Sequence, residues 1–421
     1  MTITPLLGPN GKIPILIRDD DINFFTKSSM LESIYSDVWK NQFKVSLSVI
    51  PYQKDFNDVC IPPNFRNSQE YHSVENNKEL CLFLKDKINH SHVEIIQHGV
   101  SHALIDGRGE FSRNIDGNSD KNTIINDTYS HFYNSYDKNN NNNNNIGGHN
   151  YGNNRIDLES YVNIGRNIIK KSLGIAPVFF APPFDDLSIK NLKMLLDLEM
   201  IPIYGQSNYH RFFRSPFVPN YVKRYLANKI IKRFANIGFI VPFIIPDTNH
   251  HNNQSKNGIM LHIPKRPKID PISSNKRERS QTFVKWVSTA ISYCTAQRSA
   301  LCILNHYHHY FYDWNYDSVT RKDLFEQWQQ IIHLLIKIPF SWKTSFLDLH
   351  QRIEKINKIN ISKTGLKITI GSNDLVEDIS FKVDNRLNVE KNGNLVFDDE
   401  DKTIFTINQL RPDSKTIFYL K

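Results

Sequence analysis

Three adjacent carboxylates, Asp19, Asp20 and Asp21, follow an apolar stretch near the start of the chain. Adjacent carboxylates repel one another and are costly to hold together unless a cation compensates their charge. The apolar stretch Ile13 to Arg18 predicts a strand, and α/β barrels carry catalytic residues at the carboxyl ends of such strands. Because Arg18 and Asp20 are two residues apart, they face the same side of a strand, where the guanidinium can hold Asp20 ionised. A helix N-cap or an exposed acidic loop is the structural alternative.

Two histidines, His98 and His102, follow a second apolar stretch, Val93 to Gln97. Their spacing of four residues on a helical turn would put both imidazoles on one side, where they could bind one metal ion. A lone pair at this spacing is often incidental, but carboxylates after one strand and imidazoles after another indicate a metal site. One carboxylate with two imidazoles is typical of open zinc sites and of ferrous iron oxygenases, so the ligand types do not fix the chemistry.

Two further strand ends carry groups that suit catalysis. The prolines after Pro177 to Ala181 stiffen a loop that could aim the Phe184 N–H at a developing oxyanion, although a simple strand-terminating turn explains them equally well. After Ala300 to Leu304 come three histidines, any of which could act as a general acid because imidazole titrates near neutrality. We favour His306, which is nearest the strand, and a surface cluster remains the alternative for His308 and His309.

Short β-rich stretches alternate with helical patterns, which is typical of βα units around a parallel sheet. We expect strands at Ile13 to Arg18, Lys44 to Ile50, Val93 to Gln97, Pro177 to Ala181, Ile201 to Tyr204, Ile259 to His262, Ala300 to Leu304 and Lys343 to Leu347. Apolar spacing predicts helices over Leu158 to Leu173, ending at Gly174, and around 283–294. Seven or eight such units predict a barrel within residues 1–359.

Two insertions interrupt this barrel pattern. Residues 112–155 contain an unbroken asparagine run, Asn139 to Asn145, and we expect a low-complexity loop there. Residues 207–257 are basic, and the part from 220 to 236 has the pattern of a basic amphipathic helix. Such a helix could contact a membrane or a lipid-linked substrate, but a helix packed on the barrel with a solvated basic face is the preferred interpretation.

The character of the chain changes after a helix that we expect to end near Ile359. Residues 362–421 alternate apolar and polar side chains in short stretches, and Asn392-Gly393 is a strong hairpin signal. We therefore expect a small antiparallel domain, β-sandwich-like in form, without a catalytic constellation.

The overall composition bounds the function further. The 421 residues suggest roughly two domains, and the net charge of +9 favours acidic partners, whereas no nucleic-acid-binding motif is present. The four cysteines lack CxxC spacing and suggest free thiols. No signal-peptide pattern or membrane-spanning stretch is found, so we expect a soluble, cytoplasmic protein. The sequence leaves the oligomeric state open.

In chain order, Asp-Asp, His-x3-His, the Pro-Pro loop and Leu-x-His resemble the motifs of the polysaccharide deacetylase superfamily, which includes nodulation-type chitooligosaccharide deacetylases. The first motif is similar to that of a poorly characterised branch with Arg-x-Asp-Asp. The resemblance covers residues 13 to about 350. It implies an α/β fold, an incomplete (β/α)7-type barrel, and a divalent metal, usually zinc.

The resemblance also implies roles for individual residues. It makes Asp20 the catalytic base, His306 the acid, and Pro183 and Phe184, with Pro182, part of the oxyanion site. It assigns the metal to Asp21, His98 and His102. Two positions depart from the family pattern: Ala181 replaces the arginine that normally holds the base, a role that Arg18 could take, and no aromatic motif is recognisable at Tyr204-Gly205-Gln206.

The leading hypothesis is a metal-dependent hydrolase of non-peptide carbon–nitrogen bonds that removes N-acetyl groups from an amino sugar or polysaccharide. A related amidase that acts on a non-sugar C–N bond is the first alternative. The second is a catalytically silent glycan-binding scaffold, against which the complete set of Asp20, Asp21, His98 and His102 argues.

Overall fold

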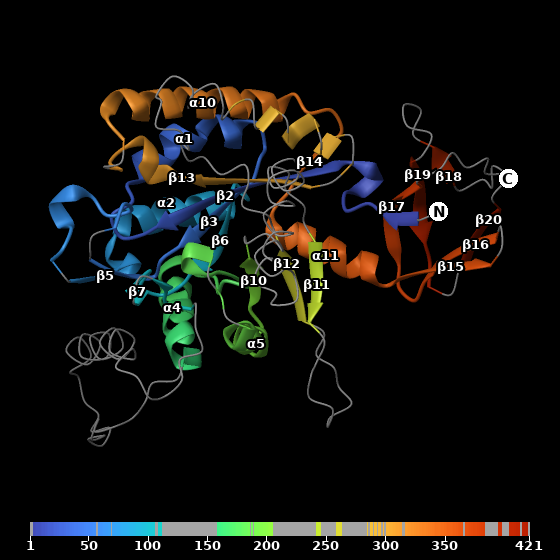
Figure 1. Cartoon of the computed structure of the whole chain (residues 1–421), viewed down its shortest axis with the longest axis horizontal. Coiled ribbons are helices and arrows are strands. Elements are labelled where there is room, and N and C mark those ends of the chain that lie inside the picture. The colour runs from blue at the N-terminus through green and yellow to red at the C-terminus, as the bar shows by residue number, and fades with distance from the viewer. Residues whose placement is uncertain are drawn as a thin grey trace, which may run out of the picture.

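The computed structural model describes residues 3–111, 158–204, 241–245, 258–262, 284–383, 395–397 and 404–419, apart from gaps of one or two residues within these ranges. Figure 1 shows an α/β body at one end of an elongated molecule and small antiparallel sheets at the other. The insertion expected at 112–155 lies outside the described residues. So does the one expected at 207–257, including 220–236, except for a strand at 241–245.

The α/β body is built on one nine-stranded sheet. Its order is β11 (Val241–Ile245), β12 (Gly258–His262), β10 (Ile201–Tyr204), β9 (Phe179–Ala181), β6 (Val93–His98), β3 (Val45–Val49), β2 (Ile13–Ile22) and β13 (Leu301–His306), and β14 (Ser341–Lys343) also pairs with β2. All neighbours from β12 to β13 run parallel, and β11 is antiparallel to β12. Among the described residues no pairing joins β12 to β13, so the barrel is open and the expected fold class is confirmed.

Amphipathic helices cover the sheet. They are α1 (Ser28–Lys40), α2 (Lys78–Asn89), α4 (Leu158–Leu173), α5 (Ile189–Asp197), α10 (Ser318–Ile336) and α11 (Phe346–Asn357). The bounds of α4 are those predicted from the sequence. Figure 1 shows α1 and α10 together on one side of the sheet, and the Trp328 indole N–H donates to the Ile34 carbonyl at 3.0 Å between them.

The strand β2 separates two apolar clusters because its side chains alternate between the faces of the sheet. Ile15 and Ile17 belong to the larger cluster, which also contains buried side chains of the outer helices α1 and α10. Leu16 belongs to a smaller cluster with Phe346 and Leu349 of α11. All ten residues of β2 are buried, so polar groups near its end must find partners inside the protein.

The strand expected at Lys343 to Leu347 is wrong. β14 ends at Lys343 and α11 begins at Phe346, because the Ser345 side chain accepts from the Asp348 backbone N–H and caps the helix.

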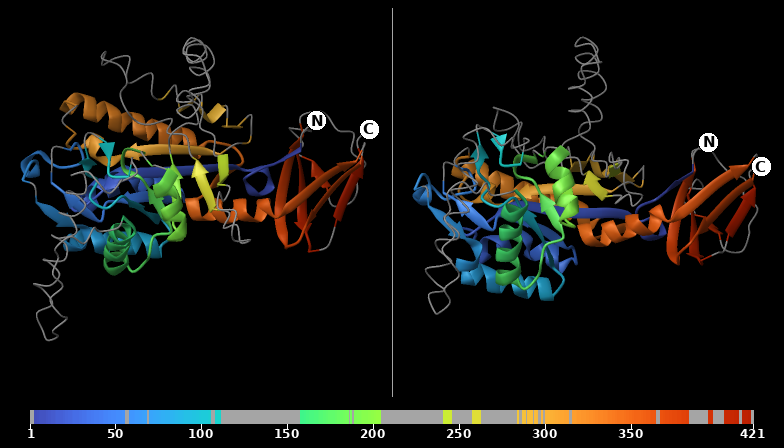
Figure 2. Two further views of the ribbon diagram at one scale, coloured as in Figure 1. Left: turned by 60° about the horizontal axis from the view of Figure 1, so that its bottom comes forward. Right: turned by 90° about the horizontal axis from the view of Figure 1, so that it is seen from below.

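Two antiparallel sheets lie beyond α11 (Figure 2). One contains β15 (Ile359–Thr364), β16 (Lys367–Ser372) and β20 (Lys415–Tyr419); the other contains β1 (Ile3–Pro5), β17 (Val376–Val383), β19 (Ile404–Leu410) and β18 (Leu395–Phe397). Their buried side chains form a separate apolar cluster. Ile3 pairs with Val383, so the start of the chain adds a strand to this unit, which the sequence had not indicated. The predicted turn at Asn392-Gly393 lies outside the described residues.

Two expectations from composition bear on the described residues. All four cysteines are buried and form no disulfide. Among the described residues, no helix combines the length and apolar character needed to cross a bilayer.

Candidate metal centre

The end of β2 is irregular, and this irregularity brings two consecutive aspartates to one cavity. Side chains of a regular strand alternate between its two faces. Asp21 has a φ of +69°, and the register between β2 and β3 shifts between Asp19 and Ile22. Asp20 and Asp21 therefore both line the cavity, whereas Asp19 contacts the Tyr35 hydroxyl of α1. A positive φ at a non-glycine residue is uncommon and tends to occur at functional sites.

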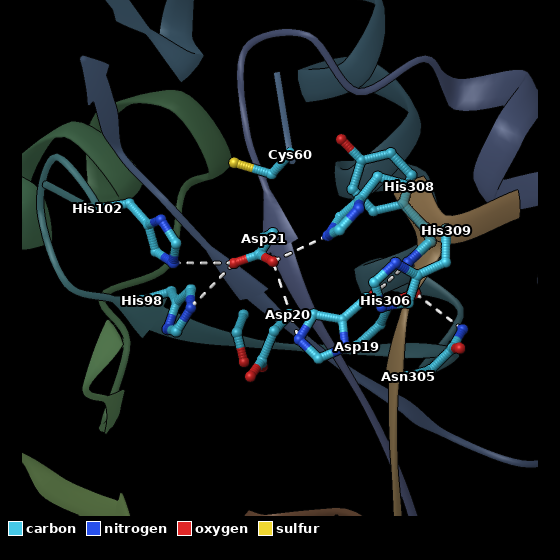
Figure 3. A network of polar contacts seen from close by, with 12 residues as sticks. Asp19, Asp20, Asp21, Cys60, His98, His102, Asn305, His306, His308 and His309 are labelled. Carbon is cyan, nitrogen blue, oxygen red and sulfur yellow. Dashed lines mark hydrogen bonds and ion pairs between the residues drawn. The ribbon is translucent and has the colours of Figure 1, made fainter. Parts of the chain in front are cut away.

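His98 and His102 converge on Asp21, as Figure 3 shows. The Asp21 Oδ1 atom lies 3.2 Å from His98 Nε2 and 3.1 Å from His102 Nε2. The expectation of a helical turn is wrong: His98 ends β6, and the chain continues as a loop in which Gly99 and His102 have φ values of +59° and +56°. The positive φ values in this loop, rather than helical periodicity, bring the two imidazoles together.

The outward-facing nitrogens of both imidazoles are already engaged. His98 Nδ1 lies 2.9 Å from the Ala181 carbonyl oxygen, and His102 Nδ1 lies 3.2 Å from Asp58 Oδ2. When these nitrogens donate, each Nε2 keeps its lone pair for an ion beside Asp21. Bonds of about 2.0–2.2 Å to one ion place neighbouring ligand atoms roughly 2.8–3.1 Å apart in octahedral geometry and roughly 3.3–3.6 Å apart in tetrahedral geometry, and the observed distances lie at the boundary between these ranges. The spacing and the donor types of these three residues therefore fit a divalent cation.

The charges around His102 also suit a cation. Burial by itself would lower the pKa of His102, but Asp21 and Asp58 raise it well above its ordinary value. Burial would raise the pKa of Asp21, but His102, with the hydrogen bonds of His308 and His98, lowers it well below its usual range. Two ionised carboxylates thus hold a proton on His102 that metal binding would displace.

Asp58 was not identified from the sequence. It is an isolated acidic residue in the loop between two short strands, β4 (Tyr52–Lys54) and β5 (Tyr71–Ser73), and its burial cannot be read from its neighbours. Its carboxylate also accepts the Cys60 backbone N–H at 3.1 Å.

Asp20 is held by Arg18 in a two-point contact, as the spacing along β2 predicted. Arg18 Nε donates to Asp20 Oδ1 and Nη2 donates to Oδ2, both at 2.6 Å, and both side chains are buried. Burial alone would raise the pKa of Asp20, but the charge of Arg18, with smaller contributions from His98 and His306, lowers it. Arg18 therefore favours the ionised form of Asp20 beside the three ligand candidates.

The turn after β13 brings further imidazoles to the cavity. His306 pairs in register with Asp20 across β13 and β2, and its Nε2 lies 3.8 Å from Asp21 Oδ2. The chain then forms a short 3-10 helix, Tyr307–Tyr310, in which His308 Nε2 lies 3.0 Å from Asp21 Oδ2. His309 Nδ1 lies 2.6 Å from Asp313 Oδ2. The interpretation of His308 and His309 as a surface cluster is wrong, because both are buried.

Phe184 lies at the mouth of the cavity. It is part of the short 3-10 helix Pro183–Asp185, has a φ of +57°, and its ring centroid is 4.6 Å from that of His102. Its side chain is 40% exposed. Pro183 packs against the loop of residues 99–102, here called the ligand loop. The packing is so close that a Cβ on Gly99 would lie 2.4 Å from Pro183 Cγ. Position 99 therefore requires glycine, because any larger residue would collide with Pro183.

A buried carboxylate, Glu110, supports the loop that carries the histidines. It accepts the backbone N–H groups of Val100 at 2.8 Å, His102 at 3.3 Å and Ser101 at 3.4 Å. It also accepts the Ser101 hydroxyl at 2.9 Å and the Tyr161 hydroxyl at 2.8 Å. These bonds fix the loop backbone, and nothing in the sequence around Glu110 indicated this contact.

The cavity between these groups has a volume of about 160 Å³. It is much smaller than the roughly 300–1,000 Å³ of pockets that enclose a whole drug-sized ligand. Its lining comes from Asp20, Asp21, Asp58, Val59, His98, His102, Phe184, Leu304, His306, His308 and His309. A space of this size and polarity suits a small reacting group at the end of a larger molecule.

No protein-family model matches the sequence, and no curated protein is similar to it. Similar solved structures include a protein described as a polysaccharide deacetylase from Mycobacterium smegmatis, with 9% identity and a TM-score of 0.43 over 84% of this chain and 94% of that one. A domain of a multidomain xylanase from the hindgut metagenome of Trinervitermes trinervoides has 11% identity and a TM-score of 0.37 over 82% and 92%. An allantoinase has 9% identity and a TM-score of 0.42 over 83% and 93%. The nodulation-type branch stays a prediction.

Proposed function

We propose that this protein is a metal-dependent hydrolase that removes an N-acetyl group from an amino sugar, alone or within a polysaccharide. The observation that supports it is the position of Asp21, whose Oδ1 faces two imidazole nitrogens while Asp20, ionised by Arg18, lines the same cavity. A site with three ligands and a free carboxylate leaves positions for water and for substrate. Zinc is the proposed ion because two imidazoles and one carboxylate are a common ligand set of hydrolytic zinc sites.

The dimensions of the cavity support the choice of a small acyl group. A volume of about 160 Å³ can enclose an acetamido group, whereas a sugar ring attached to it would lie outside. The partly exposed Phe184 ring at the mouth offers an apolar surface to that outer portion.

Each residue then has a role that follows from its position. A bound divalent cation would polarise the scissile carbonyl and make a neighbouring water more acidic. Asp20 takes the proton from the attacking water, and Arg18 keeps Asp20 ionised. The Phe184 backbone N–H is proposed to donate to the developing oxyanion. His306, next to Asp20 in register, protonates the departing amine.

Replacing Asp20 by Asn tests the assignment of the base. The change keeps the size of the side chain but removes the proton acceptor, and turnover should fall by about 10²–10⁴-fold. Zinc content, measured by mass spectrometry, should stay at the wild-type level because the three ligands are intact. Asp348→Asn is the matched control: it makes the same chemical change where the residue pairs with Lys44, outside the cavity, and should leave turnover unchanged. Wild-type turnover in Asp20→Asn would refute the role of Asp20.

The substrate class is tested separately, with zinc-loaded protein. We expect acetate release from N-acetylated amino sugars and oligosaccharides, and none from small linear or cyclic amides. The opposite selectivity would indicate an amidase for non-sugar C–N bonds. Tight glycan binding without acetate release would indicate a scaffold.

A further inference from the structure

The two oxygens of the Asp21 carboxylate have different surroundings. Oδ1 faces His98 and His102, at 3.2 and 3.1 Å, and is the oxygen assigned to the metal. Oδ2 points to the opposite side, towards the turn after β13, where His308 Nε2 lies 3.0 Å away (Figure 3). We propose that His308 is a positioning residue that orients Asp21 so that only Oδ1 is presented to the ion. This inference rests on the metal site of the proposed function.

A contact on Oδ2 matters because the carboxylate can otherwise rotate about its Cβ–Cγ bond. The Asp21 backbone has a positive φ and provides no regular strand packing to fix the side chain. A ring N–H that donates to Oδ2 removes this freedom and leaves the lone pairs of Oδ1 directed at the two imidazoles. The affinity for the ion then benefits from a ligand set that is already arranged before binding.

His308 is itself held firmly enough to act in this way. Its side chain is 1% exposed, and its ring packs against that of His309 at a centroid distance of 4.5 Å. Its backbone carbonyl accepts the N–H groups of Phe311, Tyr312 and Asp313, each at 3.1 Å, which fixes the turn. Within the described part of the chain, Nδ1 has no hydrogen-bond partner, so the Asp21 contact is the only hydrogen bond of this ring.

The neighbouring histidines differ from His308 in what they contact. His306 Nε2 is 3.8 Å from Asp21 Oδ2, beyond hydrogen-bond distance, and its side chain is 12% exposed to the cavity. His309 is directed at Asp313, with Nδ1 2.6 Å from Oδ2. Of these three imidazoles, His308 is the one whose nitrogen lies within hydrogen-bond distance of Asp21. His350 of α11 is the control, because its side chain is only 12% exposed and it does not line the cavity.

The test is the affinity for Zn²⁺, measured by competition with a chromophoric chelator on the full-length protein. His308→Leu keeps the bulk of the ring and removes the donor, and we expect affinity to fall about 10–100-fold while one zinc still binds at saturation. His308→Gln restores an N–H donor and should recover most of the loss. His350→Leu makes the same change outside the cavity and should bind zinc as the wild type does. Thermal unfolding of each variant checks that it is folded.

The possible failures are distinct. If the wild type binds one zinc and His308→Leu binds it equally tightly, the inference is wrong and the proposed function stands. Equal affinity of the Leu and Gln variants, both weakened, would also overturn it, because a donor would then have no effect. If the wild type binds no zinc, the proposed function fails, and the inference fails with it.

Discussion

The two ends of the central sheet both bury carboxylates, and the pKa shift of Glu94 at the amino end is opposite in sign to those of Asp20 and Asp21 at the carboxyl end. At the amino end, Glu94 of β6 accepts the Ser46 hydroxyl and the backbone N–H groups of Phe346 and Leu347, at 2.6, 3.0 and 2.8 Å. Burial raises its pKa, and these bonds lower it by less. At the carboxyl end, burial would also raise the pKa values of Asp20 and Asp21, but their charged and hydrogen-bonding partners have the larger effect and lower both values.

The difference lies in the partners. Glu94 meets neutral donors, which solvate a carboxylate only in part, whereas Asp20 meets a full guanidinium charge and Asp21 meets imidazoles. The pKa values of Asp20 and Asp21 therefore stay low in spite of burial, as a base and a metal ligand require. Burial raises the pKa of the adjacent Asp19 to about 8, because its partners, the Tyr35 hydroxyl and the Tyr307 backbone N–H, are neutral. The amino end uses its carboxylate to cap α11. The candidate metal site and the contacts that cap α11 thus lie at opposite ends of one sheet.

Breaking the charged pair at the carboxyl end should have the largest effect. Arg18→Met leaves Asp20 buried without its partner, and the free energy of unfolding at pH 7 should fall by about 3–5 kcal/mol. The pKa of Asp20 should rise, because burial raises it and Arg18 no longer lowers it. Its folded state then gains a proton more readily than wild type, so the deficit should shrink as the pH falls. Denaturant unfolding at several pH values measures both effects.

The double variant Arg18→Met/Asp20→Asn is the control for that experiment. Removing both charges should restore most of the lost stability, because no uncompensated charge remains. Equal stability of Arg18→Met and the wild type at pH 7 would show that the pair does not determine the ionisation of Asp20.

Removing the support of the ligand loop should have the next largest effect. Glu110→Ala leaves the N–H groups of Val100, Ser101 and His102 without their acceptor, at a cost of about 2–3 kcal/mol in unfolding free energy. Zinc affinity should fall as well, because His102 loses its fixed backbone. Tyr161→Phe removes the hydroxyl that contacts Glu110 and Ser101, both at 2.8 Å, and should cost about 1 kcal/mol because Glu110 keeps its other donors. Unaltered zinc affinity in Glu110→Ala would show that the contacts of Glu110 with the loop do not contribute to zinc binding.

The smallest effect is expected at the amino end. Glu94→Gln keeps an acceptor for α11 and removes a buried charge, so stability at neutral pH should change by less than about 1 kcal/mol. Because the folded pKa of Glu94 lies above its ordinary value, its contribution to stability falls as the pH rises between the two values. The stability of the variant should lack this pH dependence, so its free energy of unfolding should rise relative to that of the wild type as the pH rises. Zinc affinity should not change, and a change would contradict the separation of the two ends.

The strands could be predicted because each is a short apolar stretch that must be buried. This holds for Ile201–Tyr204, predicted with its observed bounds, and for the helix Leu158–Leu173. The error at Lys343 to Leu347 came from overlooking a local signal, since Ser345 with Asp348 three residues later is a capping pattern. The strand Ile3–Pro5 could not be assigned in this way, because its partner lies almost four hundred residues along the chain.

The sequence by itself determined which chemical groups would meet. Acidic and imidazole side chains follow strands that run parallel, and the carboxyl ends of such strands lie at one edge of the sheet. Only the tertiary structure decided how they meet: the positive φ of Asp21 turns two neighbouring carboxylates to one side, and the loop with Gly99 aligns the imidazoles. Asp58, Glu110 and His308 acquire their partners solely through folding, because a hydrogen bond between segments distant in sequence leaves no periodic pattern in either one.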